Sequence, residues 1–145
     1  MDISKHFESF LKRNNISHVI KNNTISFSFE GKNYLLILDS QDPHYYRLTL
    51  PKVNDSYVDS NERDRLLILL SSEIKVAKII DTKTDGIWFS YEQLLMSEND
   101  SDCDYVFARS IRILSVMLDR YRTMIQERTQ NILNETEVTP IVTND

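Results

Sequence analysis

The sequence has few of the residues that give a chain sharp bends or covalent cross-links. Only two glycines, three prolines and one cysteine occur among its 145 residues. So few glycines exclude the glycine-rich loops that cradle phosphates and dinucleotides, and they argue against a collagen-like or linker-rich architecture. The single Cys103 cannot form an internal disulfide, which is typical of a protein from a reducing compartment.

Long apolar runs and an excess of positive charge are also missing. The longest apolar run, Leu66 to Leu70, is far shorter than the roughly 20 residues of a membrane-spanning helix. The first fifteen residues are charged and contain no apolar signal-peptide core. The net charge of −5 disfavours nucleic acids and anionic membranes as partners, since both attract clustered positive charge. We therefore expect a cytoplasmic protein that binds neither.

The first half of the chain has the pattern of one helix followed by three strands. Apolar residues recur at helical spacing over residues 2–14. Residues 16–20 are compatible with a short extended piece. Runs with the apolar pattern of strands then follow; they are 24–30, 34–38 and 45–50. We expect Pro51 to end the last run, because proline cannot donate a hydrogen bond to a sheet.

The second half begins with another helix. Asp59 and Glu62 have the spacing of a capping box, which predicts the start of this helix. Its run Leu66 to Leu70 is apolar all round, so we expect the helix to be buried on more than one side. Two alternating runs follow, with the hairpin signal Asp-Gly between them; they are 75–81 and 87–92.

The most strongly patterned segment is a predicted helix over residues 104–133. Six apolar residues at spacings of three and four form one stripe along it; they are Phe107, Ile111, Leu114, Leu118, Tyr121 and Ile125. We assign this stripe to the core of the domain. A thinner second line runs beside it; its members are Val106, Ile113, Met117 and Met124. A helix of about thirty residues spans some 45 Å, which is longer than the domain can cover, so we predict that the second line is a partner or dimer interface.

These elements predict a single α+β domain over residues 1–133. We expect an antiparallel sheet with helices on one face, in the order α-β-β-β-α-β-β-α, closed by the long C-terminal helix. Residues 134–145 have no apolar period, so we expect a disordered tail there.

No residue pattern in the chain specifies a reaction. The run Asp100-Ser101-Asp102-Cys103-Asp104 is similar to the start of a calcium loop, but Tyr105 stands where that loop needs glycine and Ile111 where it needs glutamate. We expect Asp102 and Asp104 to cap the long helix instead. The surrounding acids also suppress the Cys103 thiolate, and the histidines lack metal-ligand spacing. We therefore predict no enzyme activity, no metal and no cofactor.

Three stretches carry a resemblance to a known family. They are FLKRNNISHVIKNNTISFSFEGKNYLLILD, RLLILLSSEIKVAKIIDTKTDGIWFSYEQLL and ARSIRILSVMLDRY. In their apolar pattern and in the order of their predicted elements they resemble the YbjN-like proteins and the related type III secretion chaperone-like fold, over about residues 3–125. Leu70 to Ile74 departs from the asparagines of many members, so no functional residue is carried over.

The resemblance implies a bacterial, non-enzymatic and usually dimeric module that binds proteins, as a chaperone or a regulatory adaptor. The sequence therefore predicts a cytoplasmic homodimer with a polypeptide partner. The alternative is a toxin-neutralising immunity protein, which would use the acidic run from Glu98 to Asp104 against a basic toxin.

Overall fold

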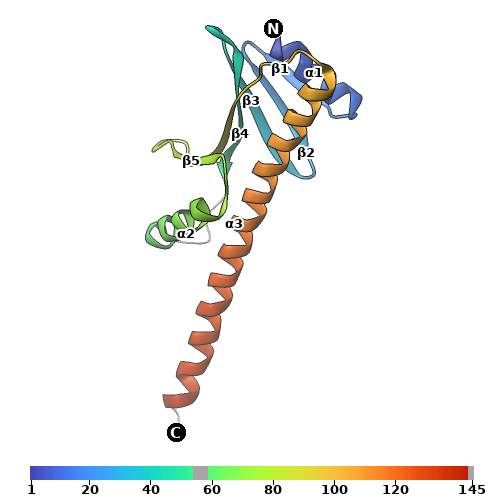
Figure 1. Ribbon diagram of the computed structural model, residues 1–145. Helices are drawn as coiled ribbons and strands as arrows, with labels where there is room; N and C mark the ends of the chain where they lie inside the picture. The colour runs from blue at the N-terminus through green and yellow to red at the C-terminus, as the bar shows by residue number, and fades with distance from the viewer. Residues whose placement is uncertain (54–58, 144–145) are drawn as a thin grey trace.

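The computed structural model describes the backbone of residues 1–53 and 59–143, with side chains up to Glu135. Its element order, α-β-β-β-β-α-β-β-α, confirms the α+β class and adds one strand to the order that we expected (Figure 1). The elements are α1 (Ile3–Arg13), β1 (His18–Lys21), β2 (Thr24–Phe29), β3 (Lys32–Asp39), β4 (Asp42–Val53), α2 (Ser60–Glu73), β5 (Ala77–Asp81), β6 (Ile87–Leu94) and α3 (Asp100–Thr143).

The six strands form one antiparallel sheet in the order β1-β2-β3-β4-β6-β5. The extra strand β1 and the strand β5 are therefore its two edges. Ile25, Leu36, Leu48 and Tyr91 lie side by side in the register, and all four are buried. Because side chains alternate between the two faces of a strand, this row marks the face that packs on the helices.

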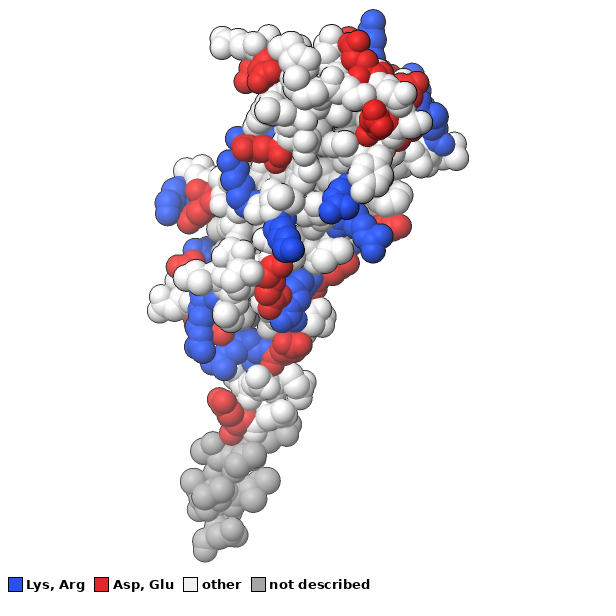
Figure 2. Space-filling model, in the orientation of Figure 1, with Lys and Arg blue, Asp and Glu red and all other residues white. Residues whose placement is uncertain are grey.

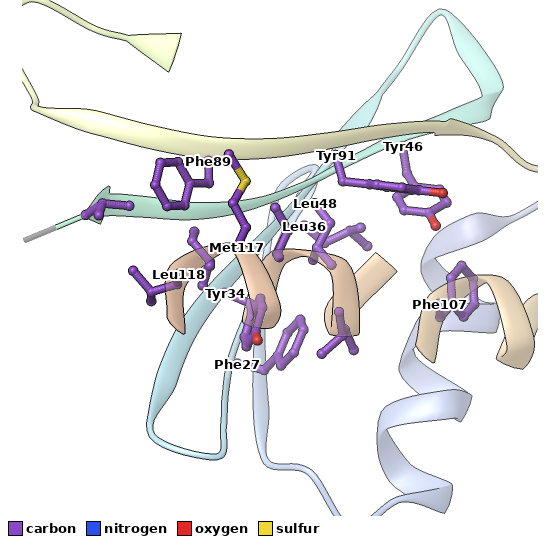
Figure 3. Close-up of a cluster of buried hydrophobic side chains, with 14 of the residues drawn as sticks. Phe27, Tyr34, Leu36, Tyr46, Leu48, Phe89, Tyr91, Phe107, Met117 and Leu118 are labelled. Atoms are coloured by element: carbon purple, nitrogen blue, oxygen red, sulfur yellow. The ribbon is translucent and has the colours of Figure 1, made fainter. Parts of the chain in front are cut away.

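The core lies between this face and the helices α1 and α3, as expected from the sequence. Phe107 contacts Phe7 and Phe10 of α1, with ring centroids 4.6 and 5.7 Å apart, and Tyr46 of the sheet at 5.6 Å. Figure 3 shows the sheet residues turned towards Met117 and Leu118 on α3. All six residues of the predicted first stripe are buried, so the core assignment of that stripe is confirmed.

β4 continues through Pro51 to Val53, so the expectation that Pro51 ends this strand is wrong. The pairing of β4 with β6 shifts register between Leu50 and Val53. The pairing of β4 with β3 has already stopped at Thr49. Proline is tolerated at such an irregularity, because no ladder hydrogen bond is required of it there.

Helix α2 begins where the capping box predicts, with the Asp59 side chain accepting from the backbone N–H of Glu62 at 2.8 Å. Its burial differs from the expectation. Leu66, Leu67 and Leu70 are buried, but Ile68 is 70% exposed and Leu69 is 50% exposed. The helix is therefore buried on one side only, since α3 and β5 cover one flank of it.

Helix α3 begins at Asp100 and is capped by Asn99, not by Asp102 or Asp104. The Asn99 side chain accepts from the backbone N–H groups of Ser101 at 2.9 Å and Asp102 at 3.3 Å. An asparagine immediately before the helix can reach these free donors, whereas residues inside the first turn cannot. Asp102 still complements the positive end of the helix dipole from within that turn.

The backbone of α3 continues to Thr143, where we had expected a disordered tail from residue 134. No glycine or proline interrupts the sequence between Asp104 and Thr139, so nothing local ends the helix earlier. Its 44 residues span about 66 Å at 1.5 Å per residue. Figure 1 shows the last part of α3 extending beyond the sheet and α2.

Candidate interaction surfaces

The four residues that we predicted as an interface belong to the core. Met117 and Met124 are 1% and 5% exposed, and Val106 and Ile113 are half-buried against the same cluster. On a helix this second line lies directly beside the first stripe. Helix α3 packs against α1, α2 and the strands β4 and β6. Val106, Ile113, Met117 and Met124 therefore do not form a free docking surface, which corrects the sequence-based assignment.

The acidic run before α3 is paired within the chain. The carboxylate of Glu98 lies 3.2 Å from the amino group of Met1. Three further acids of the run also have partners; Asp100 lies 3.3 Å from His6 Nδ1, Asp102 accepts from Ser97 Oγ at 2.8 Å, and Asp104 forms an ion pair with Arg13. These contacts fix the start of α3 against α1, so the run has a structural role in this fold.

Two of the chemistries considered in the sequence, a metal site and a reactive cysteine, can be compared with the geometry. Within residues 1–53 and 59–143, no cluster of three His, Cys, Asp or Glu side chains could hold a metal ion. Burial raises the pKa of the Cys103 thiol, and the neighbouring carboxylates of Asp100 and Asp104 raise it further. A thiol in these surroundings is a weak nucleophile.

The first exposed apolar surface in the described part of the chain is the edge strand β1. Its Val19 is 64% exposed and its Ile20 is 43% exposed. Val19 lies opposite Ser26, and Ile20 lies opposite the buried Ile25, so the two apolar side chains flank the edge on opposite faces of the sheet. We call this feature the β1 edge.

The opposite edge, β5, is protected by an ion pair, a backbone hydrogen bond beyond its end and a helix. Lys78 of β5 lies 2.9 Å from Glu92 on β6, and Asp81 accepts from the backbone N–H of Lys83 at 2.9 Å. Helix α2 also packs against β5. Charged side chains and covering helices are common means of blocking an edge strand. The difference makes the β1 edge the more open of the two.

The second exposed apolar surface is the outer side of α2, formed by Ile68 and Leu69, which we call the α2 ridge. Ion pairs fix the helix behind it, with Glu73 2.8 Å from Arg120 and Glu62 3.0 Å from Arg128. The hydroxyls that follow the ridge are already satisfied. Ser71 donates to the carbonyl of Ile68 and Ser72 to that of Leu69, each at 2.7 Å.

Basic and acidic side chains intermingle over the face of the molecule seen in Figure 2. A binding site for nucleic acid would require a broad area of positive charge. Within the described residues, no helix combines the length and the apolar character needed to cross a membrane.

Sequence reasoning did not single out the β1 edge or the α2 ridge. Val19 and Ile20 lie in a run too short to be assigned as a strand with an open edge. The α2 ridge did leave a signal, because the run Leu66 to Leu70 is apolar on all sides of the helix. We interpreted that signal as burial within the domain, whereas the structure leaves one side of the run uncovered.

No protein-family model matches the chain, and a search of curated proteins found no relative. Among solved structures, the chain is similar to an uncharacterized protein from Methanothermobacter thermautotrophicus. The match has a TM-score of 0.62 and 10% sequence identity, and it covers 87% of this chain and 98% of that chain. A likeness at this identity shows a shared fold and nothing about activity.

Proposed function

We propose that this chain is a non-enzymatic, cytoplasmic protein-binding module that works as a homodimer and holds an extended segment of a polypeptide partner along the β1 edge. The observation that carries the proposal is the exposure of Val19 and Ile20 on a strand that pairs on one side only among the described residues. An open apolar edge of this kind is a template for strand addition.

The backbone of β1 offers groups that an extended polypeptide can pair with. The two-residue turn Asn22-Asn23 makes Lys21 and Thr24 the hydrogen-bonded pair at the end of the hairpin. Hydrogen-bonded and non-hydrogen-bonded pairs alternate along antiparallel strands, so His18 and Ile20 direct their N–H and C=O groups away from β2. Only an extended polypeptide offers donors and acceptors at the matching interval.

The side chains of the edge add apolar contact on both faces. A strand added next to β1 would meet Val19 on the open face of the sheet and Ile20 on the helix face. Cross-strand contacts of this type contribute roughly 0.2–1 kcal/mol each. Main-chain hydrogen bonds would supply affinity, and these two contacts would favour apolar residues in the partner.

The α2 ridge supports the homodimer. Ile68 and Leu69 leave an apolar surface on the exposed side of a helix whose other side, with Leu66, Leu67 and Leu70, is buried. The neighbouring hydroxyls of Ser71 and Ser72 lose no hydrogen bond when they are buried, because both donate within the helix. Both signs of charge flank the ridge, so a second copy related by a twofold axis meets no single-sign repulsion.

Selection from a library of short extended peptides tests the β1 edge. We expect peptides with alternating apolar residues to bind the wild-type chain. Ile20→Pro removes one outward N–H and Val19→Lys removes one apolar contact, so each should weaken binding by about tenfold, the scale of one or two lost contacts. Val116→Lys, the same exchange at an exposed site on α3, should bind normally. Equal binding by all four proteins contradicts the proposal.

Light scattering tests the homodimer separately. The wild-type chain should have the mass of a dimer, and Ile68→Asp with Leu69→Asp should give a folded monomer, because two buried carboxylates are costly to desolvate. Val116→Asp serves as the control at another exposed apolar site. A wild-type chain that remains a monomer at high concentration overturns the homodimer and leaves the β1 edge to be judged by peptide binding alone.

A further inference from the structure

An open cleft of about 430 Å³ lies away from both surfaces, between the end of α1, the β2–β3 turn and the middle of α3. Its floor is apolar; it consists of Phe10, Ile16 and Ile111, which are buried, and Phe29, which is half-buried. Small-ligand sites in proteins have volumes of roughly 300–1,000 Å³ and a largely apolar lining. In size and lining, this cleft has the properties of such a site.

Two opposite charges stand at the rim of the cleft. Arg112 of α3 and Glu30 of the β2–β3 turn both line it, and both are exposed. Neither has an oppositely charged partner among the described residues, whereas Arg13 and Arg47 are each paired with a carboxylate. One cation and one anion above an apolar floor suit a ligand that carries both charges on an apolar body.

A buried hydroxyl lies beside the cleft. The hydroxyl of Tyr34 is buried and lies close to Ser115, which lines the cleft. Burial raises the pKa of Tyr34 to about 12, and the negative charges of Glu30 and Asp119 contribute. Tyr34 therefore adds a buried polar group to the same region as Glu30 and Ser115.

We propose that the cleft binds a free α-amino acid with a bulky apolar side chain, such as leucine or phenylalanine. The apolar side chain would lie on the floor, the carboxylate at Arg112 and the ammonium at Glu30. A simple carboxylic acid would leave Glu30 unpaired beside a like charge, and a simple amine would do the same at Arg112. This site is distinct from the β1 edge and the α2 ridge, so it would add small-molecule sensing to protein binding.

Calorimetric titration of the full chain tests the proposal. Leucine and phenylalanine should bind, and glycine should not, because it has no side chain for the floor. N-acetyl-phenylalanine and phenylalanine amide each lack one charge and should bind about tenfold more weakly, the scale of one lost charge-assisted hydrogen bond. Arg112→Gln and Glu30→Gln should each cause a similar loss.

Arg109→Gln is the matched control, since Arg109 is exposed on the same helix but does not line the cleft. It should bind phenylalanine like the wild type. Ala108→Trp, which fills the rim with a large side chain, should abolish binding in a protein whose circular dichroism is unchanged. The proposal is overturned if no amino acid binds, or if binding does not depend on either charge. Peptide binding at the β1 edge is measured independently and does not change with these outcomes.

Discussion

The ammonium group of Lys32 lies 3.0 Å from a carboxylate oxygen of Asp119, which joins the start of β3 to the middle of α3. The lysine side chain is only 8% exposed, while the aspartate is open to water. A buried ammonium needs a partner, because its desolvation is otherwise uncompensated. The contact therefore holds α3 in register with the sheet.

Removing the carboxylate should destabilise the fold. Asp119→Asn leaves Lys32 with a weaker, uncharged partner, and we expect the free energy of unfolding to fall by about 1 kcal/mol, since the exposure of Asp119 limits the loss. Urea unfolding measures the change. Asp64→Asn, at a similarly exposed carboxylate paired with its neighbour Arg63, should change stability by less than about 0.5 kcal/mol. Equal losses in both variants would argue against a special role for Lys32.

Truncating Met117 should affect stability more than assembly. The side chain is fully buried between α3 and the sheet, so Met117→Ala should cost about 2–5 kcal/mol through lost contacts and a cavity. Val116→Ala, one residue away and exposed, should cost less than about 0.5 kcal/mol. Thermal unfolding compares the two, and light scattering should find the same mass for both folded proteins. A change of mass without loss of stability would restore Met117 as an interface residue.

The cap of α3 can be tested against the acids that follow it. Asn99→Ala removes the acceptor for two backbone N–H groups and should destabilise the protein by about 1 kcal/mol. Ser101→Ala changes an exposed side chain in the same turn, for which we expect no measurable effect. If chemical denaturation shows equal stability for Asn99→Ala and the wild type, the Asn99 cap does not contribute measurably to the stability of the fold.

Val76 has a backbone conformation that disfavours its side chain. Its φ is +60°, in the left-handed region where a β-branched residue is strained by roughly 1–2 kcal/mol. The side chain is exposed, so replacing it removes no packing. Val76→Asn should therefore raise the free energy of unfolding by about 1 kcal/mol, because asparagine tolerates this region. A lower midpoint in urea would show that the valine side chain makes a contribution of its own.

Alkaline pH should destabilise the fold through Tyr34. Its pKa is raised from 10.0 to about 12, first by burial and then by nearby negative charge, while Ser115 acts in the opposite direction. Between these two values the unfolded chain loses the proton and the folded chain keeps it, so stability falls as pH rises from about 10 to about 12. Urea unfolding across this range should show a smaller fall for Tyr34→Phe than for Tyr105→Phe, which changes an exposed tyrosine.

The parts of the fold that follow from local pattern were predictable. The apolar stripe from Phe107 to Ile125 and the apolar alternation in β2 each mark one buried face of a helix or strand. Such a pattern predicts both the type of element and the side of it that packs on the core. The prediction that Pro51 ends its strand was wrong, because it assumed that every residue of the strand donates a hydrogen bond to its neighbours. The register shift between Leu50 and Val53 removes that requirement at Pro51, and a shift of this kind depends on the paired strand. The prediction that the second line on α3 is an interface failed for a related reason. Two adjacent apolar stripes on a helix can both face one wide core, or they can face two separate surfaces. The spacing of the residues in the sequence is the same in both cases.

The candidate surfaces were less predictable, because exposure depends on what the rest of the chain leaves uncovered. Ile68 has the same apolar character as its buried neighbour Leu67, and only the position of α3 and β5 decides which one meets water. The cleft brings together Ile16, Glu30 and Arg112, which are far apart in sequence. No local pattern connects them.

The order of the sheet has a consequence for binding strength. β1 and β5 form its opposite edges, and α2 packs against β5. Two copies joined at α2 would therefore leave both β1 edges free. Such a pair would be bivalent: a partner with two suitable segments, once held at one edge, would reach the second at a high effective concentration if the linker between the segments is long enough. A partner that binds each edge weakly would then be held tightly by both edges together. A short peptide with a single segment would dissociate quickly.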